Sequence, residues 1–190
     1  MKNRIIYAAV ITSLFFAACS KDKTVVTPLP TTVKTKSITV NFSPSSSFTF
    51  FSFRDTSIVA NSDSATSKWD FALRLTTFLV NSNASGPGNA GVILQDALYD
   101  NVMVAPSSGY AYDSTSSQRA IKDGSWYDYN PTTHSFVPKA GKTFIFRTAD
   151  GHYSKMELLG VGYEPFTGPV PQRLIYSFRY TYQPNSDNKF

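Results

Sequence analysis

Several segments of this chain alternate apolar and polar residues with a period of two, and this pattern restricts the fold more than any other feature. Apolar or aromatic side chains occupy every second position in residues 37–42 and 174–182, and most clearly in a segment that starts at Trp69 and is expected to run on towards Val80. This period is typical of a strand that buries one face. An aromatic-rich run at 48–54 predicts a further strand.

Turn signals separate these segments. Asp150-Gly151 lies between two alternating runs, 143–148 and 152–159, and an Asp-Gly pair in that position predicts a β-hairpin. The segment 81–91 is so rich in Gly, Asn and Ser that it predicts a loop, and the short apolar run 92–94 follows it.

Residues 105–125 are mostly small and polar, which predicts long connections, and no segment has the pattern of a long amphipathic helix. The sequence therefore predicts an all-β fold, a single antiparallel β domain with long loops. The whole chain has 26 Phe and Tyr residues, most of which are available to fill a core and to line a slot.

The first residues have the order of a secretory signal. Lys2 and Arg4 precede an apolar run over 5–16, and Ala17-Ala18 precede Cys19. The run is shorter than the roughly 20 residues that a membrane-spanning helix needs. Because the single cysteine of the chain lies where acylation requires it, we expect cleavage after Ala18 and a lipid on Cys19. The alternative is an ordinary secretory signal followed by a stray cysteine.

These features divide the chain into a lipoprotein signal peptide (1–18), a lipidated flexible tether rich in Thr, Pro and Lys (19–36) and a β domain (37–190). The residues before Cys19 resemble the relaxed lipobox of Bacteroidetes, which implies an outer-membrane lipoprotein anchored through that lipid. The sequence leaves open whether the domain faces the periplasm or the cell surface. With one cysteine, the domain has no internal disulfide.

Charge and residue inventory argue against several functions. The formal charge of +5 falls to +3 without Lys2 and Arg4, and the sequence has no cluster of Lys and Arg that could bind a phosphate backbone. Nucleic acid is therefore not an expected partner. Two histidines, no thiol other than Cys19 and no Gly-x-Ser-x-Gly motif argue against catalysis. A hydrolase built on a carboxylate pair stays as an alternative, and no zinc-ligand spacing is present.

Four segments together resemble the HmuY family of Bacteroidetes lipoproteins. They are Lys68–Arg74 (KWDFALR), the loop 81–91, Phe144–Met156 (FIFRTADGHYSKM) and Phe178–Gln183 (FRYTYQ). In this order they span nearly all of residues 37–183. The resemblance implies a hand-like all-β domain that clamps haem between loops, takes part in haem and iron acquisition and delivers haem to an outer-membrane receptor.

The matching segments are framework strands and turns, and they contain no obligatory haem ligand. Low-spin haem carriers hold iron between His or Met side chains. His152 adjoins the predicted turn and Met156 fits the core, which leaves Met103 and His134 as the predicted pair. Aromatic residues of the same part of the chain are predicted to stack on the porphyrin or contact its propionates: Tyr110, Tyr112, Trp126, Tyr127 and Tyr129. The alternative is an HmuY-like lipoprotein that lacks a haem site and binds another ligand or a protein.

Overall fold

The computed structural model describes residues 28–165, 168 and 170–190. The predicted signal peptide and Cys19 lie outside these residues. Within the described part of the chain, no helix is long and apolar enough to cross a membrane. The strands are β1 (Val33–Asn41), β2 (Thr49–Ser52), β3 (Ser57–Val59), β4 (Phe71–Arg74), β5 (Thr77–Val80), β6 (Gly91–Asp96), β7 (Tyr127–Asn130), β8 (Ser135–Pro138), β9 (Lys142–Arg147), β10 (Tyr153–Tyr163) and β11 (Arg173–Gln183). Two 3-10 turns, η1 (Asn61–Asp63) and η2 (Tyr99–Asn101), complete the elements.

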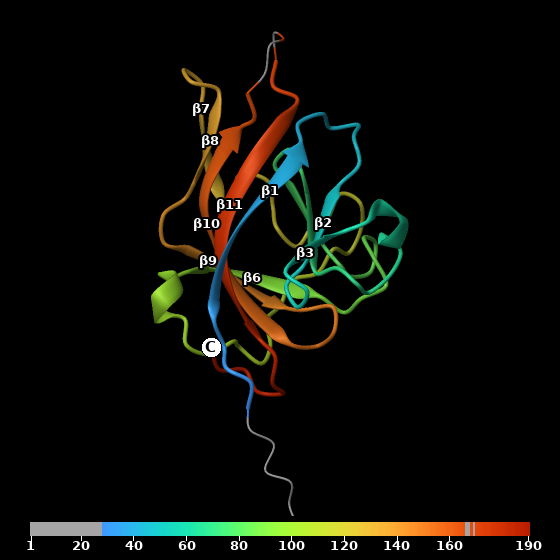
Figure 1. Ribbon diagram of the computed structural model, residues 1–190, viewed down its shortest axis with the longest axis vertical. Helices are drawn as coiled ribbons and strands as arrows, with labels where there is room; N and C mark the ends of the chain where they lie inside the picture. The colour runs from blue at the N-terminus through green and yellow to red at the C-terminus, as the bar shows by residue number, and fades with distance from the viewer. Residues whose placement is uncertain (1–27, 166–167, 169) are drawn as a thin grey trace, which may run out of the picture.

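The strands form three antiparallel sheets (Figure 1). A five-stranded sheet has the order β1-β11-β10-β9-β6, a four-stranded sheet has the order β3-β2-β4-β5, and β7 pairs with β8 alone. The two larger sheets face each other, and the core lies between them. The predicted all-β fold is therefore confirmed.

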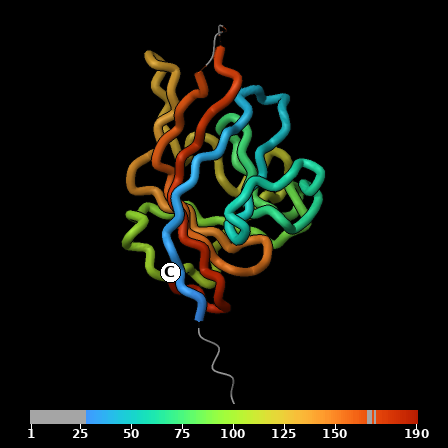
Figure 2. Tube along the Cα trace, in the orientation of Figure 1, coloured from blue at the N-terminus to red at the C-terminus, as the bar shows by residue number. Residues whose placement is uncertain are grey.

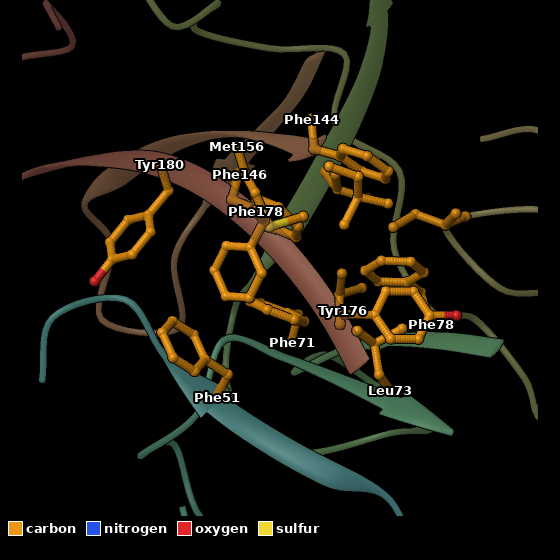
Figure 3. Packing of buried hydrophobic residues seen from close by; sticks show 14 of the residues in the cluster. Phe51, Phe71, Leu73, Phe78, Phe144, Phe146, Met156, Tyr176, Phe178 and Tyr180 are labelled. Carbon is orange, nitrogen blue, oxygen red and sulfur yellow. The ribbon is translucent and has the colours of Figure 1, made fainter. Parts of the chain in front are cut away.

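Aromatic rings fill the space between the two larger sheets (Figure 3). Phe51 and Phe71 of the smaller sheet meet Phe178 of β11 at ring-centroid distances of 5.3 Å and 5.9 Å. The alternation in β11 places Leu174, Tyr176, Phe178 and Tyr180 on the core side, all fully buried. Burial of this much aromatic surface is the main stabilising contribution in a chain without a disulfide.

The Asp150-Gly151 hairpin is also confirmed. Gly151 has a φ of +85°, in the left-handed region that glycine adopts without strain. β9 and β10 pair on either side of this turn, with Tyr153 opposite Arg147. Met156 of β10 is fully buried, as its place on the strand predicts.

The strand predicted from Trp69 towards Val80 is in fact a hairpin. β4 ends at Arg74, the chain turns at Leu75 and Thr76, and β5 returns with Thr77 opposite Arg74. Leu75 has a φ of +49°, and its N–H donates to Asn41 O at 2.9 Å. A contact with β1 thus fixes a turn that contains no Gly, Asn or Asp.

Trp69 does not share the inner face of this hairpin. Its fully buried ring packs with Phe50, Ala72 and Leu79 in a second cluster on the other face of the smaller sheet. Its Nε1 donates to Ser64 O at 2.9 Å. The period-two pattern thus holds for Phe71 and Leu73 and breaks before β4.

The loop over 81–91 packs closely around the side chain of Asn81, its first residue. The side chain of Asn81 donates to Trp69 O at 2.7 Å and accepts from Gly88 N at 2.9 Å. A Cβ on Gly86 would lie 2.2 Å from Asn81 Oδ1, so this approach requires glycine. The composition of the loop follows from this close packing.

One boundary differs from the sequence expectations, and three strands are additional. β1 begins at Val33, within the segment expected to be a tether, because residues 33–36 pair with Phe178–Thr181 of β11. Strands β3, β7 and β8 were not predicted. The β7–β8 hairpin follows the segment 105–125, and the sequence analysis assigned no strand to its residues.

Candidate functional site

The predicted ligand His134 lies in the turn of the β7–β8 hairpin, at one end of the molecule (Figures 1 and 2). Asn130 shapes this turn, since its Oδ1 accepts the N–H groups of Thr132 and Thr133 at 2.9 Å and 3.2 Å. His134 follows with a φ of +51°, a conformation that is uncommon for residues other than glycine. The turn thus presents an exposed histidine on a defined backbone.

Two tyrosines hold His134. The hydroxyl of Tyr129 lies 2.7 Å from His134 Nδ1, and the hydroxyl of Tyr163, at the end of β10, donates to His134 O. No described residue forms a hydrogen bond with His134 Nε2. The ring is therefore oriented through one nitrogen, while the other nitrogen is free for a ligand.

A chain of aromatic side chains begins beside this histidine. The ring of Tyr129 lies 5.4 Å from that of Phe136 and 6.2 Å from that of His134, and Phe136 lies 5.3 Å from Tyr127. We call this group the hairpin patch: Tyr127, Tyr129, His134, Phe136 and Tyr163. Tyr129 is 49% exposed. Partial burial raises the pKa of Tyr163 and of Tyr127, the latter further because its hydroxyl donates to Asp123.

Three of the predicted porphyrin contacts lie elsewhere or are buried. Trp126 is 1% exposed and packs against Phe78 and Tyr176 in the core, with no described partner for its Nε1. Tyr110 donates to Pro106 O at 2.8 Å, and the hydroxyl of Tyr112 accepts from Arg147 at 2.6 Å. Of the predicted contacts, only Tyr127 and Tyr129 lie in the hairpin patch.

Met103 lies in another part of the molecule. Its carbonyl accepts the N–H of Phe190 at 2.9 Å, next to a bridge between Val104 and Lys189. The carbonyl of the preceding residue, Val102, accepts from Lys155 Nζ at 2.8 Å, near the start of β10. Met103 is 58% exposed beside the C-terminus.

The structure does not bring Met103 and His134 together. His134 contacts Tyr163 at the end of β10, and Met103 adjoins the residue that binds Lys155, eight positions earlier on the same strand. Eight residues of strand span roughly 26 Å. Two side chains bonded to one iron must present their ligand atoms within a few ångströms, and the structure places Met103 and His134 much farther apart than that.

Phe136 and Tyr163 were missed at the level of sequence. Tyr163 lies 29 residues after His134, and only the path of β10 brings it to the hairpin. Phe136 belongs to β8, whose four residues are too few to show a period.

Comparisons with known proteins support the fold. Neither a protein-family model nor a curated protein matches the sequence. Among solved structures, the chain is similar to the apo HmuY analogue of Tannerella forsythia, with a TM-score of 0.55 and 15% identity over 83% of this chain and 99% of that one. It is also similar to a lipoprotein candidate from Bacteroides fragilis (TM-score 0.51, 13% identity, 80% and 92% covered). Apo PinO from Porphyromonas gingivitis gives a TM-score of 0.50 at 12% identity, with 80% and 98% covered.

The three neighbours are covered over 92% or more of their length, so the likeness extends to the whole β domain. At these identities it shows the fold alone. The chain has an HmuY-like fold, as the sequence resemblance predicted.

Proposed function

We propose that this chain is a membrane-anchored, non-catalytic lipoprotein that binds haem at the hairpin patch, with His134 as an axial ligand. The observation that carries the proposal is the state of His134: its Nδ1 lies within hydrogen-bond distance of the Tyr129 hydroxyl, its Nε2 has no partner among the described residues, and the exposed ring of Tyr129 and the half-buried ring of Phe136 lie beside it. The lipid on Cys19 would hold the protein at the outer membrane, where it would serve haem and iron acquisition and pass haem to an uptake receptor.

The residues of the hairpin patch fit one face of a haem. Histidine ligands of metals commonly bind through one nitrogen while the other is held by a hydrogen bond, which fixes the orientation of the ring. The hydroxyl oxygen of Tyr129 is placed to accept that hydrogen bond from Nδ1–H, which leaves Nε2 unprotonated for the iron. The rings of Tyr127, Tyr129 and Phe136 provide an aromatic surface on which a porphyrin can stack. When bound, haem supplies an iron centre with an axial position that His134 Nε2 would occupy.

The patch offers one protein ligand to the iron. Of the other histidines and methionines that the structure describes, Met156 and His152 lie at least seven positions before Tyr163 along the β10 segment, and Met103 lies beside the C-terminus. We therefore expect a single histidine ligand, and a five-coordinate, high-spin spectrum for the reduced complex.

The lack of a second ligand also favours a rival function, that of an HmuY-like lipoprotein without a haem site, which would use the hairpin patch to bind another ligand or a protein. A titration of the purified protein with haemin separates the two. Haem binding predicts a sharp, saturable Soret band that is lost in His134→Ala. A broad, unsaturable absorbance, equal in both proteins, would exclude haem as the ligand and leave the rival.

A further inference from the structure

A second candidate site lies beside the root of the β7–β8 hairpin. It is a cleft of about 390 Å³ between the chain that precedes β2, the β4–β5 turn and the loop before β7. Its lining combines cations, hydroxyl groups and two apolar side chains: Phe48, Arg74, Thr76, Thr77, Ser116, Ser117, Arg119, Ile121, Lys122 and Asp123. None of these residues belongs to the hairpin patch.

Positive charge dominates this cleft. Arg74, Arg119 and Lys122 face one carboxylate, that of Asp123, which also accepts a hydrogen bond from Tyr127 at 2.8 Å. Among the described residues, no carboxylate lies within ion-pair distance of Arg74 or Lys122. Cations gathered without carboxylate partners repel one another, and an anion between them would remove that repulsion.

Contacts within the protein fix the side chains of both arginines without a ligand. Arg74 donates through Nη1 to Ser46 O at 3.0 Å, and its guanidinium carbon lies 4.2 Å from the ring centre of Phe48. Arg119 donates through Nη1 to Ser85 Oγ at 2.6 Å. Each arginine is therefore fixed through one nitrogen and keeps further N–H groups, in the planar arrangement that suits a carboxylate or a phosphate.

The buried Asp113 forms an ion pair with Arg119. The two side chains are 3.5 Å apart, and Asp113 also accepts hydrogen bonds from Val80 N, Ala120 N and Ser85 Oγ at 3.1 Å, 2.8 Å and 2.6 Å. The charge of Arg119 is thus paired, so Arg119 brings N–H groups to the cleft, and the positive charges without a carboxylate partner among the described residues are those of Arg74 and Lys122.

We propose that this cleft binds a small molecule that carries an oxyanion, a carboxylate or a phosphate, held between Arg74, Arg119 and Lys122. Phe48 and Ile121 provide an apolar wall for the rest of the ligand, and the four hydroxyl side chains can bond its polar groups. The inference does not depend on haem binding, because it uses none of the residues of the hairpin patch.

Titrations of the full-length protein, followed by amide chemical shifts, test this site. Inorganic phosphate and glucuronate represent the two sources of oxyanion, and glucose is the neutral counterpart of glucuronate. We expect saturable shifts at residues 116–123 with at least one of the two anions, weaker at higher salt, and none with glucose. Shifts that grow linearly with all three compounds, or none at all, would overturn the proposal.

Matched variants test whether the anion-dependent shifts arise from binding in the cleft. Lys122→Gln removes a charge that has no described partner, and it should weaken anion binding roughly fivefold or more, because hydrogen bonds to charged groups are among the stronger ones. Arg74→Gln should act in the same direction, and Arg74→Lys should restore part of the affinity. Lys36→Gln on β1 removes the same charge outside the cleft and should change little. An equal loss in Lys36→Gln and Lys122→Gln would show an effect of net charge only and would contradict the site.

The haemin titration distinguishes this proposal from the previous one. Lys122→Gln should leave the Soret band unchanged, and His134→Ala should leave the anion-dependent shifts unchanged. Failure of one experiment therefore leaves the other proposal standing.

Discussion

The carboxylate of Asp70 joins the two large sheets through the backbone of Ala149. Its Oδ1 accepts the N–H of Ala149, in the β9–β10 turn, at 2.8 Å, and its Oδ2 accepts the N–H of Phe53 at 2.7 Å. Asp70 is 5% exposed. Burial raises its pKa to about 6, although the two N–H groups oppose that shift.

This pKa makes the stability of the fold depend on pH. Because the pKa of Asp70 is higher in the folded state than in the unfolded chain, its contribution to stability is fully present below about pH 4 and is lost as pH rises through about 6. A shift of about two units corresponds to about 3 kcal/mol. We expect the free energy of unfolding of the wild type, relative to that of Asp70→Asn, to fall by about this amount between pH 4 and pH 7.

Urea melts of both proteins across that pH range measure the difference. Asn has nearly the shape of Asp and does not titrate, so the other carboxylates cancel in the comparison. A difference that stays constant, or grows, with rising pH would show that Asp70 is ionised throughout.

Trp69 is expected to be essential for stability although it lies outside the main core. Trp69→Ala should cost about 3 to 5 kcal/mol, because it empties the centre of the second cluster and leaves Ser64 O without its donor. Trp69→Phe separates the two effects, since it keeps most of the volume and loses the N–H group. His152→Ala, at a half-buried turn position, should cost less than about 1 kcal/mol. Similar denaturation midpoints for Trp69→Ala and His152→Ala would refute this placement.

The two described methionines provide a second contrast in stability. Met156 is fully buried between the sheets, so Met156→Ala should cost about 2 to 5 kcal/mol. Met103 is 58% exposed, so Met103→Ala should change stability by less than about 0.5 kcal/mol. Thermal unfolding of the two variants checks this order, and a larger loss for Met103→Ala would contradict the described core.

The haem spectrum should depend on His134 and not on Met103. If haem binds at the hairpin patch, His134→Ala removes its axial nitrogen and should shift or abolish the Soret band. Met103→Ala should leave the band unchanged, because Met103 contacts Phe190 and not the hairpin. Equal shifts in the two variants would favour the paired ligands that the sequence suggested.

Cys19→Ala should release the protein from the membrane. Each buried CH₂ of an acyl chain contributes about 0.8 kcal/mol, so two chains outweigh the attraction of a weakly basic domain to a lipid surface. Cell fractionation followed by immunoblotting measures the distribution. Retention of Cys19→Ala in the membrane fraction would show that the anchor is elsewhere.

The long strands could be predicted because apolar side chains alternate with polar ones along them, as one buried face requires. In β11 every second residue from Leu174 to Tyr180 is buried, and the period is visible in the sequence. The β4–β5 hairpin could not be predicted in this way. Its turn at Leu75 depends on a hydrogen bond to Asn41, a contact between segments that are distant in the chain.

The candidate site was only partly predictable for a related reason. His134 could be named from its residue type and its polar surroundings. Its partner Tyr163 and the distance from Met103 depend on which end of β10 each segment reaches. The basic cleft gave no sequence signal, since Arg74 and Lys122 lie 48 positions apart and neither belongs to a run of charge.

The pairing of β7 with β8 alone has a consequence for local unfolding. A two-stranded sheet is at best marginally stable by itself, so the hairpin that carries His134 should open far more often than the sandwich beneath it. Its amides should therefore exchange with deuterium early, whereas those of β10 and β11 exchange late. A ligand that bridges His134 and Tyr163 would slow that exchange, so protection of residues 127–138 would report binding even where the ligand has no colour.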